Sequence, residues 1–261
     1  MKYIDTSQSD AADMAHRVAV DQPFSFRCHP DVSCFNKCCR NLNLYLYPYD
    51  VIRLKKQLQL TSDQFIERYT DAVLRDGESF PTVLLTMADT AEKECPFLSS
   101  SGCGVYQNRP YSCRMFPMDQ GVLHTAETGQ TEPVYFFKPP DFCCGRHEDT
   151  KWTPLTWLVD QMPDIYAEMT RKWAKIIGLT AQHPFSDFKA AGTKRGKMAF
   201  MAVYNVDMFR SFLFSSTFFD RYTVTADVKQ QIETSDTHLL QFGLDWFRFV
   251  LWQTASTLFK S

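Results

Sequence analysis

The residues in this chain that are best suited to chemistry are its nine cysteines, all of which lie before residue 145. They fall into three groups beside turn-forming residues, and clustered thiols of this kind serve either a disulfide framework or a metal site. The candidate ligands are Cys28, Cys34, Cys38, Cys39, Cys95, Cys103, Cys113, Cys143 and Cys144.

The rest of the sequence favours metal over disulfides. The first twenty residues are polar and lack the apolar core of a signal peptide, and no run of about 18 uncharged apolar residues could span a membrane. We therefore expect a cytoplasmic protein, and reducing compartments keep thiols unpaired. An odd number of cysteines also fits poorly with a fully paired framework.

The spacing of the cysteines leaves the identity of the metal open between zinc and an iron–sulfur cluster. Both take about four ligands, so nine thiols exceed one site and could fill two, with one thiol left over. The intervals are Cys28-x5-Cys34-x3-Cys38-Cys39 and Cys95-x7-Cys103-x9-Cys113. They contain no C-x2-C knuckle of a zinc ribbon and match no common ferredoxin pattern. In each adjacent pair, one cysteine could bind while the other packs, or the two could serve neighbouring sites.

Basic and imidazole side chains accompany the thiols. A centre of four thiolates is negatively charged, and guanidinium groups would offset that charge. We expect this role for Arg40, Arg109 and Arg114, with Arg27, Lys37 and Arg146 also beside cysteines. His29 and His147 flank the cysteine groups and could ligate a metal, although a histidine more commonly has a role other than metal binding.

The elements that must position these residues indicate an α+β protein in three parts. Residues 1–23 form a polar lead-in, residues 24–150 a loop-rich metal-binding region with short strands and helices, and residues 151–261 a helical region packed on it. Alternating or apolar runs predict strands, and amphipathic spacing predicts a first helix. A second helix should begin after Thr61, which can cap it together with Gln64. The predicted strands are 41–47, 82–87 and 134–137, and the first helix is 49–60.

The region after Arg146 is predicted to be helical. Thr153 with Pro154 is typical of a helix start, Pro163 should split the helix, and Gly178 should end it. Residues 183–196 read as a polar connector, and two apolar helices are expected over 197–219 and 238–259. Helices with apolar residues on several faces are normally buried.

Several motifs resemble one known family. Cys95-Pro-Phe-Leu, Cys103, Val105-Tyr106, Arg109-Pro110 and Cys113-Arg114-x-Phe116-Pro117 match its second signature, and Cys38-Cys39-Arg40 matches the end of its first. Asp50 and the helix after it also correspond. The chain thus resembles, over residues 27–144, the zinc- or iron-chelating cysteine-cluster family called CxxCxxCC or YkgJ-like. The first motif of this chain is wider than the compact form of the family, because five residues separate Cys28 from Cys34.

The resemblance implies a metal-binding protein that holds zinc or an iron–sulfur cluster, and it suggests a relation to the cluster region of flagellin lysine N-methylases. The alternative is therefore a cluster-dependent enzyme, either a protein lysine N-methylase-like or a redox enzyme. That alternative ranks second because the sequence has no G-x-G-x-x-G turn and no C-x3-C-x2-C radical motif.

A third possibility is an interaction module, in which aromatic helices dock a protein partner. Trp246, Phe247, Phe249 and Trp252 could form such a face, but burial in a core is the favoured interpretation. The net charge of −2 provides no excess of positive charge to neutralise the phosphates of a nucleic acid.

Overall fold

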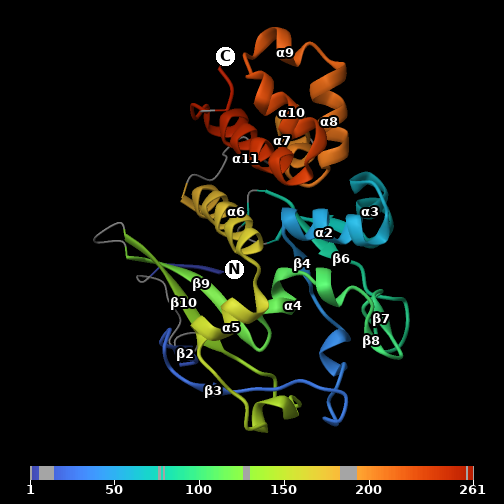
Figure 1. Cartoon of the computed structure of the whole chain (residues 1–261), viewed down its shortest axis with the longest axis vertical. Helices are drawn as coiled ribbons and strands as arrows, with labels where there is room; N and C mark the ends of the chain where they lie inside the picture. Colours follow the sequence, from blue (N-terminus) through green and yellow to red (C-terminus); the bar gives the residue numbers. More distant parts are fainter. Residues whose placement is uncertain are drawn as a thin grey trace. The chain divides into compact units, whose positions relative to one another are not determined.

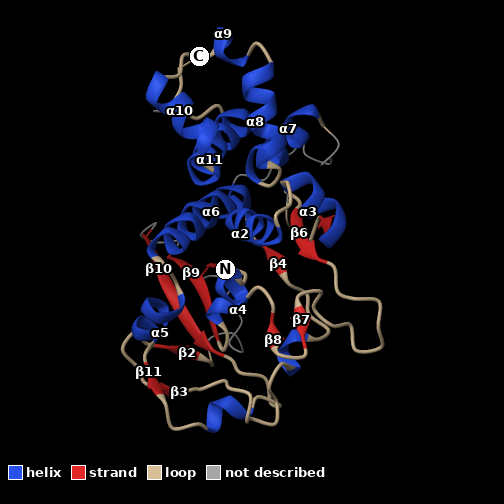
Figure 2. Ribbon diagram, turned by 45° about the vertical axis from the view of Figure 1, so that its right-hand side comes forward, coloured by secondary structure: helices blue, strands red, loops and turns tan. Residues whose placement is uncertain are grey.

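The computed structural model describes residues 2–5, 15–75, 78, 80–125, 130–182, 193–256 and 258–260. The chain divides into two compact units. The first, here called the cysteine unit, comprises Met1–Leu42, Met87–Gly104 and Tyr111–Ala167 and contains all nine cysteines. The second, the helical unit, comprises Asn43–Thr86, Val105–Pro110 and Glu168–Ser261. Short strands in small sheets and helices concentrated toward the C-terminus confirm the α+β prediction (Figures 1 and 2).

A four-stranded sheet forms one part of the cysteine unit. Its order is β1 (Lys2–Asp5), β9 (Met118–Thr125), β10 (Gln130–Phe137) and β2 (Arg17–Val18). Strands β9 and β10 are antiparallel, while β1 joins β9 in parallel (Figure 1). Leu123, Val134 and Phe136 pack into a buried cluster on one face of the sheet, and the strand predicted at 134–137 forms the end of β10.

An aromatic core holds the remaining elements of this unit. Strand β3 (Phe24–Ser25) pairs with β11 (Lys151–Trp152), and helix α5 (Pro154–Gln161) follows directly from Thr153, which caps it. The Trp157 ring lies 5.5 Å from Phe26 and 5.1 Å from Trp152, centroid to centroid. The Trp157 indole N–H donates to the Met115 carbonyl over 3.1 Å and so anchors α4 (Tyr111–Met115).

The helical unit combines a small sheet with a set of helices. The sheet order is β4 (Tyr45–Leu46), β6 (Thr82–Leu85) and β5 (Thr70–Val73), and it is accompanied by α2 (Pro48–Leu58) and α3 (Ser62–Tyr69). The Thr61 N–H donates to Gln64 over 3.0 Å, as the predicted cap requires. The C-terminal helices are α7 (Lys194–Val203), α8 (Val206–Ser215), α9 (Phe218–Arg221), α10 (Ala226–Thr234) and α11 (Asp236–Trp252).

Close packing of α11 on α7 explains the burial of the aromatic residues there. A Cβ on Gly243 would lie 2.0 Å from the Ala202 carbonyl oxygen, so only glycine permits this approach of the two helices. Trp246 and Phe247 are buried, which confirms the core interpretation for these two residues.

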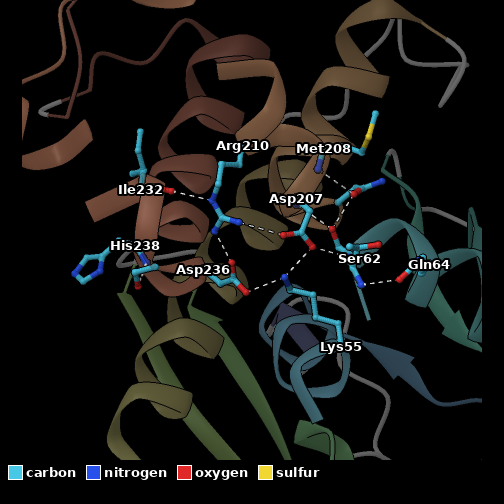
Figure 3. Close-up of polar contacts among 12 residues, drawn as sticks. Lys55, Ser62, Gln64, Asp207, Met208, Arg210, Ile232, Asp236 and His238 are labelled. Atoms are coloured by element: carbon cyan, nitrogen blue, oxygen red, sulfur yellow. Dashed lines mark hydrogen bonds and ion pairs between the residues drawn. The ribbon is translucent and has the colours of Figure 1, made fainter. Parts of the chain in front are cut away.

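A network of ion pairs links α2, α8 and α11 (Figure 3). The Lys55 amine, whose side chain is 7% exposed, lies 2.8 Å from a carboxylate oxygen of Asp207 and 2.8 Å from one of Asp236. Arg210 contacts the same two carboxylates, and the Ser62 N–H donates to Asp207 over 2.7 Å. Burial favours the neutral acids, but these donors and cations hold the pKa of both carboxyls below its ordinary value.

Three of the predicted helices differ from the structure, one of them only in its bounds: the helix predicted at 238–259 is α11, which ends at Trp252. Pro163 separates α5 from α6 (Asp164–Gln182) as expected, but Gly178 does not end α6. A glycine costs a helix only about 1 kcal/mol, and the turns around it bury Ile176 and Thr180. The single helix predicted at 197–219 is wrong as well: it is divided into α7, α8 and α9, because the Asn205 side chain accepts from the Met208 N–H and starts a new helix. Most of the predicted connector, residues 183–192, lies outside the described residues.

Within the described part of the chain, no helix combines the length and apolarity needed to cross a membrane.

Candidate metal centre

A tight turn presents the first adjacent pair of cysteines. Asn36 has a left-handed backbone conformation, with φ 64°, and the short 3-10 helix η1 (Lys37–Cys39) follows it. The Cys39 N–H donates to the Asn36 carbonyl over 3.1 Å. The Cys38 thiol donates to the Cys39 sulfur, so the two adjacent side chains meet here rather than diverge.

Backbone pairing across more than fifty residues brings Cys95 to this turn. The Cys95 N–H donates to the Cys39 carbonyl over 2.8 Å, and Arg40 forms an antiparallel bridge with Glu94. Cys103 follows through the hairpin of β7 (Leu98–Ser99) and β8 (Gly102–Cys103), in which Leu98 pairs with Cys103. Gly102 has φ 116°, a conformation that favours glycine and closes this hairpin.

Cys113 reaches the same group from α4. Besides the Trp157 contact with Met115, the guanidinium of Arg114 donates to the Gln161 carbonyl over 3.0 Å and lies over the Tyr166 ring. These contacts fix the short helix in place. Cys113 is among the cysteines whose charge raises the pKa of the Cys38 thiol. We call Cys38, Cys39, Cys95, Cys103 and Cys113 the η1 thiol group.

The other cysteines gather around Cys34. The Cys144 N–H donates to the Cys34 sulfur over 3.1 Å, and the thiols of Cys143 and Cys144 also interact with that sulfur. Cys143 precedes the 3-10 helix η3 (Cys144–His147). Cys28 is exposed, and its electrostatic neighbours include Cys34 and Cys143 as well as Cys38 and Cys39. We call Cys34, Cys143 and Cys144 the Cys34 thiol group.

The thiols strongly perturb one another's ionisation. Burial, followed by the charges of neighbouring cysteines, raises the pKa of Cys28 to about 11, and burial with the charges of Cys39 and Cys103 raises that of Cys95 to about 11. A hydrogen bond to Cys39, and then burial, raises the pKa of Cys38. Several thiolates side by side therefore need a cation to offset their charge.

Two thiols are instead biased toward the thiolate. The hydrogen bond from Cys38, with help from the charge of Arg40, lowers the pKa of Cys39 to about 7. Burial opposes ionisation of Cys34, yet the N–H groups of Cys144 and Gly145 hold its pKa below the ordinary value. Each group thus contains one sulfur whose thiolate form, the form that binds metals, is stabilised by nearby hydrogen-bond donors.

The predicted basic neighbours play different parts. Arg40 lies beside Cys39, where it donates to the Asn36 carbonyl over 3.0 Å and forms ion pairs with Glu92 and Glu94. Arg109 belongs to the helical unit, and its guanidinium lies 4.0 Å from the centre of the Tyr106 ring. Glu92 and Glu94, which precede Cys95 in the chain, are the acidic partners of Arg40, and sequence reasoning did not identify them.

The two candidate histidines have polar partners near the Cys34 thiol group. His29 lies 3.2 Å from a Glu148 oxygen and 3.5 Å from an Asp31 oxygen. His147 accepts a hydrogen bond from Arg146 over 3.2 Å. These contacts provide roles for both imidazoles that need no metal, and ligation by either stays a prediction.

The donor set suits zinc or iron in its chemistry. All nine cysteines lie in the described residues, and all nine are free thiols there. Thiolates are ligands of both structural zinc and iron–sulfur clusters. In the described part of the chain, however, no three His, Cys, Asp or Glu side chains are already arranged to hold one ion.

Thiols gathered in this way on a loop-rich unit are typical of a metal-chelating domain. Residues 27–151 match the model of the CxxCxxCC family, described as a "Putative zinc- or iron-chelating domain". All nine candidate ligands lie within the matched residues. No curated protein and no solved structure matches the chain, so the relation to flagellin lysine N-methylases stays a prediction.

Proposed function

We propose that this protein binds zinc or an iron–sulfur cluster through thiolates of the η1 thiol group. The observation that carries the proposal is the convergence of three segments: the Cys38–Cys39 turn, the Cys95–Cys103 hairpin, which the 2.8 Å bond from Cys95 to Cys39 joins to that turn, and helix α4 with Cys113. The family whose model residues 27–151 match is described as chelating zinc or iron.

The electrostatics of the group support a bound cation. Burial, together with the charges of Cys39 and Cys103, raises the pKa of Cys95 to about 11. A bound metal ion reverses this effect by stabilising all the thiolates at once. Arg40, held between Glu92 and Glu94, keeps one positive charge at Cys39.

The bound metal would give this loop-rich unit a structural centre. Zinc would act as a redox-inert staple, whereas an iron–sulfur cluster would add electron transfer. In either case the residues of the chain provide the ligands and exclude solvent, and coordination requires thiol rotations that draw the sulfurs together. Nothing among the described residues adds support to the enzyme alternative, which stays a prediction.

Elemental analysis of anaerobically purified protein, with a visible absorption spectrum, tests the proposal. We expect zinc in a colourless protein, or iron with acid-labile sulfide in a coloured one. A Cys39→Ser/Cys95→Ser variant should lose metal, while Ser100→Ala, at an exposed position in the same hairpin, should keep it. Wild-type protein that carries neither metal and reacts fully with a thiol reagent would overturn the proposal.

A further inference from the structure

We propose that an aromatic cluster on the C-terminal half of α11 is an interface between two copies of this chain, in which each copy receives residues 256–260 of the other. The cluster, here called the aromatic socket, consists of Tyr222, Phe242, Trp246 and Phe249. It lies in the helical unit, so the inference goes beyond the metal binding proposed above and does not depend on it.

The aromatic socket holds the side chain of Phe259, which is 3% exposed. The centre of the Phe259 ring lies 5.4 Å from the ring centres of Phe242, Trp246 and Phe249, and 5.9 Å from that of Tyr222. Aromatic pairs at this spacing attract each other beyond the area that they bury, and edge-to-face pairs are among the favoured arrangements. Phe259 is therefore an anchor with a defined seat.

Hydrogen bonds fix the short segment that carries Phe259. The Thr223 N–H donates to the Lys260 carbonyl over 2.9 Å, and the Lys260 N–H donates to the Thr223 carbonyl over 3.0 Å. This antiparallel bridge lies just after α9, toward which the chain returns in Figures 1 and 2. The Ser256 hydroxyl donates to the Asp245 carboxylate over 3.0 Å. All these contacts join the segment to residues between α9 and the end of α11, so the same segment from a second copy would make every one of them.

The connection between α11 and this segment has the character of a hinge. Helix α11 ends at Trp252, and Gln253 has a left-handed backbone conformation, with φ 57°. Residues with a side chain rarely adopt this conformation. Residues 253–256 form neither helix nor strand. Short hinges in an unfavourable conformation promote the exchange of a segment between copies, because a hinge that opens no longer has to make the turn.

The exchange would produce a dimer with two-fold symmetry. Phe259 of each copy would fill the aromatic socket of the other, and each Lys260 would pair with Thr223 of the other copy. Because the closed monomer and the exchanged dimer contain the same contacts, the balance between them depends on the hinge and on protein concentration. We therefore expect a monomer–dimer equilibrium.

Size-exclusion chromatography with light scattering, on the full chain under reducing conditions, tests the proposal. The dimer fraction of the wild type should rise with protein concentration. Phe259→Ala removes the anchor and should abolish the dimer. Lys260→Ala is the matched control, since Lys260 is exposed and pairs with Thr223 through its backbone alone, and it should dimerise like the wild type.

A shorter hinge should shift the equilibrium toward the dimer. Deletion of Thr254 and Ala255 shortens the connection, so that Phe259 should no longer reach the aromatic socket of its own copy. We expect this variant to be dimeric at concentrations at which the wild type is monomeric. Addition of Phe259→Ala to the deletion should restore the monomer.

Two outcomes would overturn the exchange. A wild type that stays monomeric at every concentration would leave the aromatic socket to the chain's own segment. A dimer that persists in Phe259→Ala, with the variant folded by circular dichroism, would have its interface elsewhere. Neither outcome affects the metal proposal, which is judged by metal content.

A second measurement on the wild type covers the case in which Phe259→Ala fails to fold. Unlabelled and ¹⁵N-labelled chains are mixed, concentrated and cross-linked through their lysines, and the dimer fraction is analysed by mass spectrometry. We expect cross-links from Lys260 to residues between α9 and α11 to join labelled with unlabelled peptides. Cross-links from Lys260 that join only peptides of the same label would contradict the exchange.

Discussion

Cys113 is the residue at which the metal proposal can be tested most simply. It stands on α4, whose position Trp157 and the backbone of α5 fix from one side. We expect Cys113→Ser to lower metal content and to cost about 2 kcal/mol of stability, which corresponds to a melting temperature lower by roughly 4–8 °C. Ser112→Ala, its exposed neighbour, should change neither quantity. A Cys113→Ser variant with full metal content and wild-type melting would make Cys113 a packing residue.

Cys39 should titrate differently from the other thiols in metal-free protein. The donor at Cys38 and the charge of Arg40 lower its pKa to about 7, whereas burial raises that of Cys95 to about 11. The rate of Cys39 alkylation should therefore reach half its maximum near pH 7, and that of Cys95 several pH units higher. Arg40→Gln should shift the Cys39 profile toward higher pH. Mass spectrometry of the alkylated peptides measures both profiles, and overlapping profiles would contradict this electrostatic account.

At the scale of elements, Lys55 connects α2 with α8 and α11. Removal of one member of a buried ion-pair network leaves its partners uncompensated and costs on the order of 3 kcal/mol. We expect Lys55→Met to destabilise the protein by this amount in denaturant unfolding. Lys56→Met, at the exposed position beside it, should have little effect. Equal effects of the two substitutions would show that the network adds nothing to stability.

The carboxylates of the same network predict a pH dependence. Their pKa values are lower in the folded protein than the ordinary value of 3.8, so they bind protons more weakly when folded. Their contribution is fully present above pH 3.8 and disappears as the pH falls through the folded-state values. The stability difference between wild type and Asp207→Asn should therefore shrink in acid. Unfolding curves at several pH values measure it, and a difference that stays constant or grows would contradict the assignment.

Local signals in the sequence predicted several element boundaries. Thr61 with Gln64, Thr153 with Pro154, and Pro163 act within one turn of the backbone, and the structure confirms all three. The failures at Gly178 and at 197–219 have non-local causes. Burial of Ile176 carries α6 past a glycine, and Asn205 caps a helix inside a run that is apolar enough to appear continuous.

The candidate site shows the same division between local and distant information. Residue types and the Cys-Cys pairs identify the candidate ligands, but spacing alone does not group them. The grouping depends on the contact of Cys39 with Cys95 and of Cys34 with Cys144, which join segments far apart in the chain. The shared role of Arg40, Glu92 and Glu94 was missed for the same reason.

At the scale of the whole molecule, metal removal should affect the two units unequally. Around the thiols, the cysteine unit consists largely of loops, 3-10 turns and two-residue strands, whereas α7 and α11 of the helical unit pack directly through Gly243 and Ala202. Chelation should increase hydrogen exchange in residues 27–40, 94–104 and 141–147, while the amides of α7 and α11 keep their protection. A uniform increase throughout the chain, or none, would contradict a metal that organises the cysteine unit.

The central claim, that cysteine thiolates hold the metal, is tested most directly by X-ray absorption at the metal edge of anaerobically purified protein. The account predicts a shell of sulfur atoms about 2.3 Å from the metal, as thiolate ligands give, with iron neighbours in addition if a cluster is present. A shell of nitrogen and oxygen atoms alone would contradict it.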